Sequence, residues 1–183
     1  MVKVFRGLNR ETPNVPFKSN IEAKCADKTV LIVDDNAALR GLLRVSLQAF
    51  GVAKVFEAET VDTALSLVES KRIDLVITDW KMKPRDGIDL LRQIRNPQAC
   101  SSAYVPVIML TAYSDGEHVR AARNAGASAF LIKPFTAPSL AATIMEALED
   151  DRAFVETSDY FGPDRRAGER VKVETVRPLF AAR

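Results

Sequence analysis

Short apolar runs alternate along the middle of the chain with longer segments whose apolar residues recur at helical spacing. The intervening segments carry apolar residues three or four positions apart, as in Leu39, Leu43 and Leu47, which predicts helices. The apolar runs predict strands over residues 29–33, 54–57, 74–78, 105–110 and 129–132. Five strand–helix units in succession predict the α/β class with a doubly wound, five-stranded parallel sheet.

Both ends of the chain depart from this pattern. Residues 1–28 show no sustained period, and Pro13 and Pro16 argue against a helix, so we predict a flexible N-terminal arm. The alternating pattern places the folded domain at residues 29–151. Residues 152–183 contain few large apolar side chains and predict a C-terminal tail that is too short to form a domain with its own core.

Composition excludes several classes of protein. The 183 residues are 47% hydrophobic and 27% charged, as in globular proteins, and the net charge of +2 is too small to argue for a nucleic-acid partner. Cys25 and Cys100 share no metal-ligand spacing and indicate a reducing compartment. The chain has no apolar run that could cross a membrane and its N-terminus has no signal-peptide core, so we expect a cytoplasmic protein with no membrane partner.

Polar residues directly follow four of the predicted strands. Asp34 and Asp35 follow the first strand, and Asp79 follows the third. Thr111 follows the fourth strand and Lys133 the fifth. Because the carboxyl ends of parallel strands meet at one edge of a sheet, we expect these side chains to lie together. An acid surrounded by further acids, a hydroxyl and an ammonium suggests a site for a divalent cation and a phosphoryl group.

The residue types assign a role to each position. Mg²⁺ takes oxygen ligands and needs only one or two carboxylates beside a phosphate oxygen. Asp35 and Asp79 fit as ligands, Asp34 fits as an outer ligand or a water holder, and the backbone carbonyl of Lys81 could fill a further position. The second oxygen of Asp79 can attack phosphorus. The neighbouring ammonium and hydroxyl can then pair with the other phosphoryl oxygens.

This constellation resembles the receiver domain of bacterial two-component response regulators over about residues 29–150. Five short motifs in matching order carry the resemblance: Val33-Asp-Asp35, Thr78-Asp79-Trp80, Asp86-Gly87, Leu110-Thr-Ala112 and Ile132-Lys-Pro-Phe135. The resemblance implies a flavodoxin-like sheet of order 2-1-3-4-5. It also implies Mg²⁺-dependent phosphorylation of Asp79 by a histidine kinase or a histidine phosphotransfer protein.

The same resemblance has consequences at three further positions. It implies a cis peptide bond between Lys133 and Pro134. The family commonly has Met-Pro after the acceptor, whereas here Lys83 separates Met82 from Pro84 while the loop keeps its length. Phe130 matches the family's switch aromatic, three residues before the lysine, but a permanent core residue is an equally good interpretation.

The resemblance implies a receiver-only, chemotaxis-regulator-like signalling switch that is not an enzyme and that binds an unknown downstream protein. Its last two predicted helices, with the strand between them, are the expected output surface. One alternative is a phosphoryl-transferring hydrolase on the same fold, but such enzymes usually carry a second acid two residues after the nucleophile, where this chain has Lys81. Another is a transcription regulator with its output in the tail, which is too short for a helix-turn-helix.

The tail contains the segment Tyr-Phe-Gly-Pro-Asp-Arg-Arg at residues 160–166, similar to tails after some receiver domains. Aromatic residues beside arginines suit a docking peptide for a partner, or a clasp that folds back over the domain. A solvated extension is the third interpretation. Acidic residues alternate with the basic ones from 164 to 174, so no basic stripe for nucleic acid forms.

Overall fold

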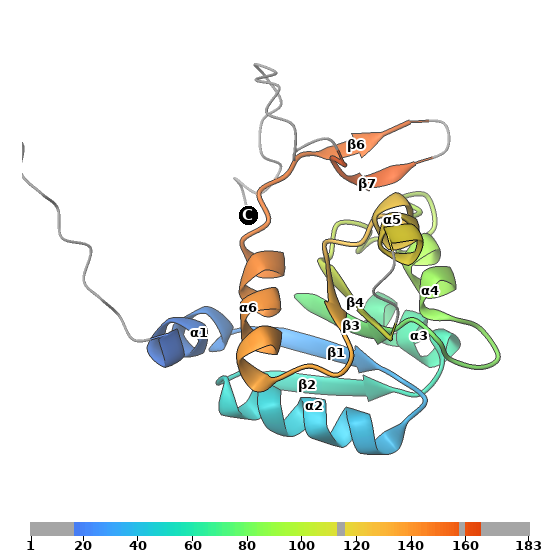
Figure 1. Cartoon of the computed structure of the whole chain (residues 1–183). Coiled ribbons are helices and arrows are strands. Elements are labelled where there is room, and N and C mark those ends of the chain that lie inside the picture. Colours follow the sequence, from blue (N-terminus) through green and yellow to red (C-terminus); the bar gives the residue numbers. More distant parts are fainter. Residues whose placement is uncertain (1–16, 113–115, 158–159, 166–183) are drawn as a thin grey trace, which may run out of the picture.

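The computed structural model describes residues 17–112, 116–157 and 160–165 (Figure 1). Five parallel strands form one sheet in the order β2-β1-β3-β4-β5, which confirms the predicted fold class and strand order. The strands are β1 (Thr29–Val33), β2 (Lys54–Ala58), β3 (Leu75–Asp79), β4 (Val107–Thr111) and β5 (Ala129–Ile132). The helices are α1 (Phe17–Cys25), α2 (Ala37–Ala49), α3 (Val61–Ser70), α4 (Gly87–Ile94), α5 (Gly116–Ala125) and α6 (Ala137–Leu148).

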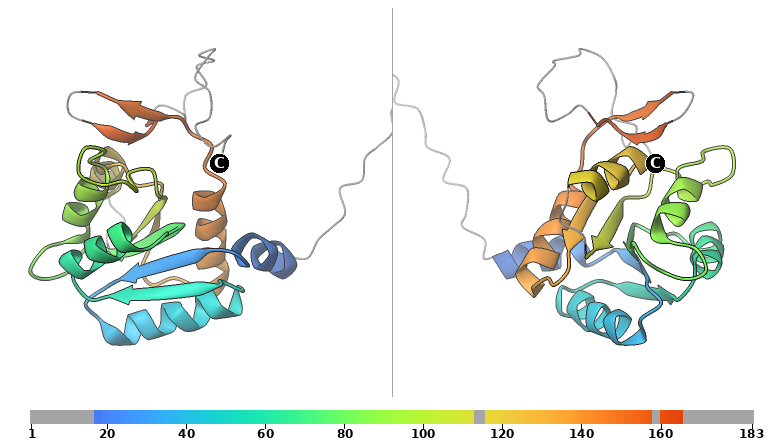
Figure 2. Two further views of the ribbon diagram at one scale, coloured as in Figure 1. Left: turned by 180° about the vertical axis from the view of Figure 1, so that it is seen from behind. Right: turned by 45° about the vertical axis from the view of Figure 1, so that its right-hand side comes forward.

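Helices cover both faces of the sheet, and each face has its own core (Figure 2). Alternate residues of β1 illustrate the division, because Leu31 packs with α3 and α4 whereas Ile32 packs with α2 and α6. All five residues of β3 and of β4 are buried, as expected for central strands of a doubly wound sheet. Side-chain caps at Asn36, Thr60 and Asp86 start α2, α3 and α4.

The strand bounds differ slightly from the predicted ones. β3 runs one residue further than expected, so Asp79 is the last residue of the strand itself. β4 begins at Val107, two residues later than predicted. Pro106 lacks an amide hydrogen to donate to a strand ladder, which explains why the ladder of β4 starts after it.

The predicted flexible arm is wrong for residues 17–25, which form α1. Ile21 and Cys25 lie one helical turn apart and are only 2% and 0% exposed, because they pack into the core beneath α2 and α6. Lys24 Nζ lies 3.1 Å from Glu149 Oε1 at the end of α6. Pro13 and Pro16 precede the helix and therefore do not interrupt it; residues 1–16 of the predicted arm lie outside the described residues.

Within the predicted C-terminal tail, residues 154–156 and 161–163 form strands. Two short strands, β6 (Phe154–Glu156) and β7 (Phe161–Pro163), pair antiparallel, and we call residues 154–157 and 160–165 the C-terminal hairpin. The Phe154 and Phe161 rings lie 4.9 and 5.2 Å from the Tyr104 ring, between centroids. Of the three interpretations of this tail, the fold-back clasp is the one that these contacts support; residues 166–183 lie outside the described residues.

Two further observations complete the fold. The Lys133–Pro134 peptide bond is cis, as the family resemblance implied, and the Lys83–Pro84 bond is cis as well. Among the helices that the structure describes, none combines the length and the apolar character that crossing a membrane requires.

We expect Ile21→Ala to lower the free energy of unfolding by about 2 kcal/mol, because it removes a buried side chain that α1 packs into the core. Urea unfolding followed by circular dichroism measures the change. Ala23→Ser, at an exposed position of the same helix, is the matched control and should unfold close to the parent. An Ile21→Ala midpoint equal to that of the parent would show that α1 adds nothing to the stability of the domain.

Candidate functional site

The register of β1 against β3 brings two acids to the same edge of the sheet. Val33, the last residue of β1, pairs with Thr78, so Asp34 and Asp79 follow at the same level on neighbouring strands. Asp34 also starts the turn into α2, because its Oδ1 accepts a hydrogen bond of 2.8 Å from the Asn36 amide. Asn36 then caps α2 through the amides of Ala38 and Leu39.

The structure gathers three carboxylates at this edge. Asp34, Asp35 and Asp79 each offer an oxygen, and these oxygens lie within 4.8 Å of one another. Asp34 is 1% and Asp79 6% exposed, whereas Asp35 is exposed. Burial first, and the nearby Asp79 charge as well, raise the pKa of Asp34 above its usual value, although the Asn36 amide opposes this shift.

The carboxylate cluster suits a hard divalent cation. Asp34 Oδ2 is buried without a hydrogen-bond partner among the described residues. Buried polar atoms are normally paired, and a cation at the centre of the cluster would satisfy this one while offsetting the repulsion between the acids. Oxygen donors alone, with one of the acids open to solvent, match the ligands of Mg²⁺, which retains several waters.

Lys133 reaches this cluster from the end of β5. Its Nζ lies 2.7 Å from Asp79 Oδ1, and the two side chains are 25% and 9% exposed. The Lys133 amide donates to the Thr111 carbonyl at 2.7 Å, which ties the end of β5 to the end of β4. Thr111 is 2% exposed at that strand end. The ammonium therefore partly offsets the negative charge on Asp79 from the side opposite β1.

The chain after Asp79 turns back sharply and packs against it. The Gly87 amide donates to the Trp80 carbonyl at 2.9 Å, and Thr78 Oγ1 donates to the Asp79 carbonyl at 3.1 Å. A Cβ on Gly87 would lie 2.0 Å from the Asp79 carbonyl oxygen, so no side chain fits there. Gly87 therefore lets the start of α4 approach the backbone of the candidate acceptor.

The structure leaves two of the predicted roles, those of Lys81 and Phe130, as predictions. The Lys81 side chain is exposed just after the strand end, and the role of its carbonyl stays a prediction. Phe130 is half-buried and packs against the core between the sheet and α3, α4 and α5. This position fits a switch aromatic and a permanent core residue equally, so its role also stays a prediction.

Sequence reasoning missed one residue that supports the site. Arg40 donates to the Asp34 carbonyl at 2.7 Å and also lies 3.3 Å from Glu57 Oε2 in β2. It thereby ties the turn after β1 to the neighbouring strand. The spacing offered a signal, because Arg40 is one helical turn after Asn36 and β2 is the expected neighbour of β1.

The chain is similar to known proteins over this domain. A family model for the response regulator receiver domain matches residues 30–145 and thus ends before the C-terminal hairpin. The chain is 35% identical to chemotaxis protein CheY of Pseudomonas aeruginosa over 120 residues, which are 66% of this chain and 95% of that protein. It is 37% identical to chemotaxis protein CheY-3 of Vibrio cholerae over 111 residues, which are 61% of this chain and 84% of that protein.

Solved structures of response regulators are also similar to this chain. Chemotaxis protein CheY4 of Vibrio cholerae superposes with a TM-score of 0.62 at 28% identity, covering 67% of this chain and 100% of that one. A putative response regulator from Chloroflexus aurantiacus superposes with a TM-score of 0.62 at 30% identity, covering 67% of this chain and 98% of that one.

We expect Asp34→Asn to raise the free energy of unfolding in a chelator by about 1 kcal/mol, because it removes a buried charge beside Asp79. The same change should weaken the stabilisation that Mg²⁺ gives to the parent by mass action. Urea unfolding with and without Mg²⁺ measures both effects. Asp35→Asn is the control, because it removes an exposed acid of the cluster and should lower only the Mg²⁺ effect. Full Mg²⁺ stabilisation of both variants would contradict the cation site.

Proposed function

Because this chain belongs to the response regulator receiver domain family, we propose that it is a phosphorylation-controlled signalling switch with Asp79 as its phosphoryl acceptor. The observation that carries the assignment is the position of Asp79. Its carboxylate ends a buried central strand, pairs with Lys133 at 2.7 Å and belongs to the cluster with Asp34 and Asp35. The comparisons do not favour a hydrolase or a transcription regulator.

The proposed reaction moves a phosphoryl group from a phosphohistidine of a partner to Asp79. One carboxylate oxygen of Asp79 forms a bond to phosphorus, while the bond from phosphorus to the imidazole nitrogen breaks and its electron pair stays on that nitrogen. The product is an acyl phosphate on Asp79 and a free histidine on the partner. Lys133 Nζ, which now pairs with Asp79, would pair with a phosphoryl oxygen instead.

Two further groups of this chain have roles in the proposal. The Thr111 hydroxyl would donate to another phosphoryl oxygen and so be drawn toward Asp79. Asp34, Asp35, Asp79 and the Lys81 carbonyl would hold Mg²⁺, which when bound supplies positive charge for the carboxylates and the phosphoryl oxygens. The new charge at Asp79 would be read by the segment after Thr111 and by Phe130, and a downstream protein would bind the altered surface.

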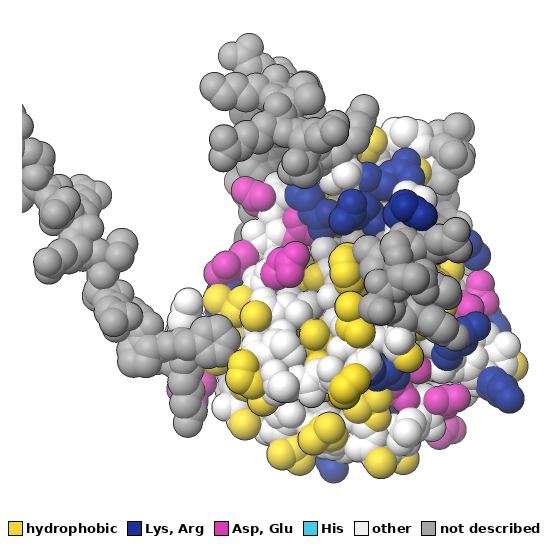
Figure 3. Space-filling model, viewed as in Figure 1, with side chains coloured by type: hydrophobic (Ala, Val, Ile, Leu, Met, Phe, Trp, Pro, Cys, Tyr) yellow, Lys and Arg dark blue, Asp and Glu magenta, His cyan; other side chains and the backbone are white. Residues whose placement is uncertain are grey.

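We assign the docking of the phosphohistidine partner to an apolar stripe on α2. Leu42 and Val45 are 58% and 60% exposed, and Ala38 and Ala49 extend the same helical face. Figure 3 shows hydrophobic side chains gathered over α2 and α6. α2 begins two residues after Asp35, so the stripe borders the edge where a partner histidine must reach Asp79. An apolar helix or helix pair bearing the phosphohistidine is the surface that fits it.

We expect phosphate to appear on Asp79 when the protein is incubated with Mg²⁺ and a small phosphodonor such as acetyl phosphate. Asp79→Asn should abolish this labelling because the attacking carboxylate oxygen is lost. Intact mass spectrometry and hydroxylamine sensitivity measure the acyl phosphate. Asp151→Asn, an exposed acid outside the site, is the control. Undiminished labelling of the Asp79→Asn protein would refute the acceptor assignment.

A separate prediction concerns the partner surface. Leu42→Asp with Val45→Asp should slow phosphotransfer from a phosphorylated histidine partner by about tenfold, because charges replace an apolar contact. The rate with acetyl phosphate should not change, since that donor needs no helix surface. Ser66→Asp, which adds a charge to an exposed position of α3 on the other face of the sheet, is the matched control. If both donors slow equally in the double variant, the stripe is not a docking surface.

A further inference from the structure

The C-terminal hairpin contacts the turn between α5 and β5 backbone to backbone. A Cβ on Gly162 would lie 3.0 Å from Gly126 Cα, and a Cβ on Gly126 would lie 3.1 Å from the Phe161 carbonyl oxygen. Gly126 also has a φ of +95°, a conformation that other residues rarely adopt. These two glycines therefore allow β7 to lie directly against the end of α5.

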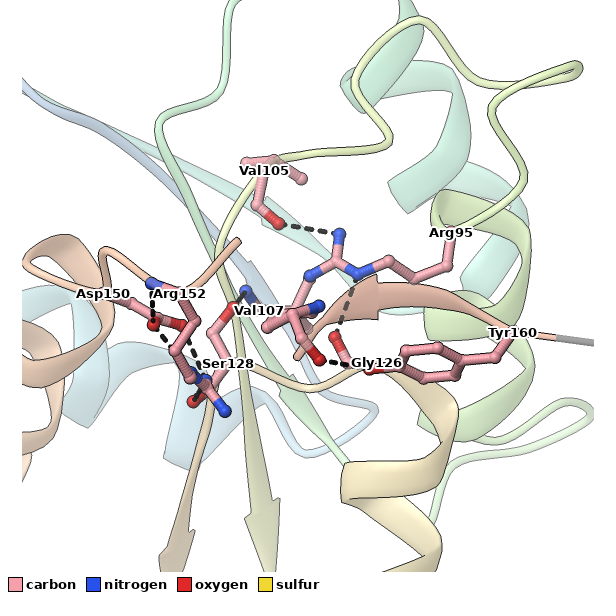
Figure 4. Close-up of polar contacts among 9 residues, drawn as sticks. Arg95, Val105, Val107, Gly126, Ser128, Asp150, Arg152 and Tyr160 are labelled. Atoms are coloured by element: carbon pink, nitrogen blue, oxygen red, sulfur yellow. Dashed lines mark hydrogen bonds and ion pairs between the residues drawn. The ribbon is translucent and has the colours of Figure 1, made fainter. Parts of the chain in front are cut away.

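Arg95 lies beneath the hairpin and joins it to three parts of the domain (Figure 4). Its Nε donates to the Gly126 carbonyl at 2.9 Å, and its Nη1 donates to the carbonyls of Ala103 and Val105 at 2.7 and 2.9 Å. The Arg95 guanidinium lies 5.3 Å from the centroid of the Phe154 ring. It is 5% exposed, and burial lowers its pKa to about 10, so it stays charged at neutral pH.

Two more arginines fasten the ends of the hairpin. Arg152, just before β6, donates from Nη2 to the Ser128 carbonyl at 2.7 Å and pairs with Asp150 at 2.6 Å (Figure 4). Arg165, just after β7, donates to Asn124 Oδ1 in α5 at 3.0 Å and stacks 4.0 Å above the Tyr160 ring. The hairpin is thus held to the last turn of α5 and to the residue before β5.

The unit β4–α5–β5, which contacts the hairpin at one end, carries two residues of the candidate site at its other end. β4 ends with Thr111, α5 begins five residues later, and β5 is followed by Lys133. The unit β4–α5–β5 therefore has Thr111 and Lys133 at one edge of the sheet and Asn124, Gly126 and Ser128 at the other. A displacement of α5 that follows a movement of Thr111 must change the backbone contact between Gly126 and Gly162.

We propose that the C-terminal hairpin is a clasp that holds α5 in the arrangement in which Lys133 pairs with Asp79, and that phosphorylation of Asp79 loosens it. This inference rests on the proposed function. The contacts of the clasp are short and of fixed geometry, so they oppose any shift of α5 relative to α4 and β4. Coupling between two sites is reciprocal. A weakened clasp must therefore favour the phosphorylated arrangement.

The experiment uses the full chain with Mg²⁺ and beryllofluoride, a mimic of the phosphoryl group. Hydrogen exchange is followed at the Thr157 and Asp164 amides, which donate to the Tyr160 and Ala153 carbonyls. Beryllofluoride should speed this exchange about fivefold, the lower end of typical coupling between sites. Gly162→Ala should speed it without beryllofluoride and should tighten beryllofluoride binding about fivefold. The added Cβ would lie 2.7 Å from Tyr160 Oη and 3.0 Å from Gly126 Cα, so β7 must shift relative to both.

Gly41→Ala is the matched control, because a Cβ at Gly41 would meet nothing within 4 Å. It should change neither the exchange of the hairpin nor the affinity for beryllofluoride. Arg165→Ala is a second test variant, since it removes contacts of an exposed side chain and leaves the glycine packing in place. It should act in the same direction as Gly162→Ala.

The outcomes distinguish a failure of the clasp inference from a failure of the proposed function. If beryllofluoride does not bind the parent, or binds Asp79→Asn equally well, the proposed function fails. If it binds the parent through Asp79 but hairpin exchange stays unchanged, the clasp inference is overturned while the proposed function stands. The clasp is also overturned if Gly162→Ala and Arg165→Ala loosen the hairpin without tightening beryllofluoride binding.

Discussion

Repulsion between carboxylates at one sheet edge is the constraint on which the rest of this structure depends. Asp34 and Asp79 are both almost fully buried, and their oxygens lie within 4.8 Å of each other and of Asp35. A fold of marginal stability can hold such a cluster only where the backbone fixes the positions of the acids. The register of β1 against β3 fixes Asp34 and Asp79 here, because both strands are buried between two helical layers. The Lys133 ammonium offsets part of the negative charge, and a bound cation can offset the remainder.

Both chain extensions reinforce the opposite edge of the sheet. α1 packs where β1 begins, and its Lys24 pairs with Glu149 at the end of α6. The hairpin packs near the starts of β4 and β5, against Tyr104 and Gly126. The described residues of both extensions thus lie at the strand starts, not at the strand ends that carry the acids. Added stability is placed where it does not obstruct the approach of a phosphodonor.

The sequence predicted the parts of this protein whose structure follows from local pattern. The apolar runs gave the five strands, and the polar residues after them gave the members of the site, because strand ends in a parallel sheet share one edge. Short elements that depend on tertiary contacts were missed. Among the α1 residues whose burial the structure describes, Ile21 and Cys25 are the buried ones, and β6 and β7 have three residues each, so neither segment shows a period that reveals its structure. The contacts that stabilise these segments come from residues far away in the sequence. α6 contacts α1, and Arg95 and Tyr104 contact the hairpin.

The burial of Arg95 explains why the sequence did not predict the hairpin. An arginine near the end of an amphipathic helix is expected in solvent, since burying a guanidinium costs free energy unless its donors are paired. Here Nε and Nη1 donate to the carbonyls of Ala103, Val105 and Gly126, and the centroid of the Phe154 ring lies 5.3 Å from the guanidinium carbon. Nη2 is buried without a hydrogen-bond partner among the described residues. A lysine could not replace it, because a single ammonium cannot serve carbonyls on separate segments while presenting a flat face to a ring. The burial of Arg95 therefore links the end of α4, the start of β4, the end of α5 and the C-terminal hairpin. That one side chain gives an extension outside the family match a direct mechanical connection to the strands that carry the candidate site.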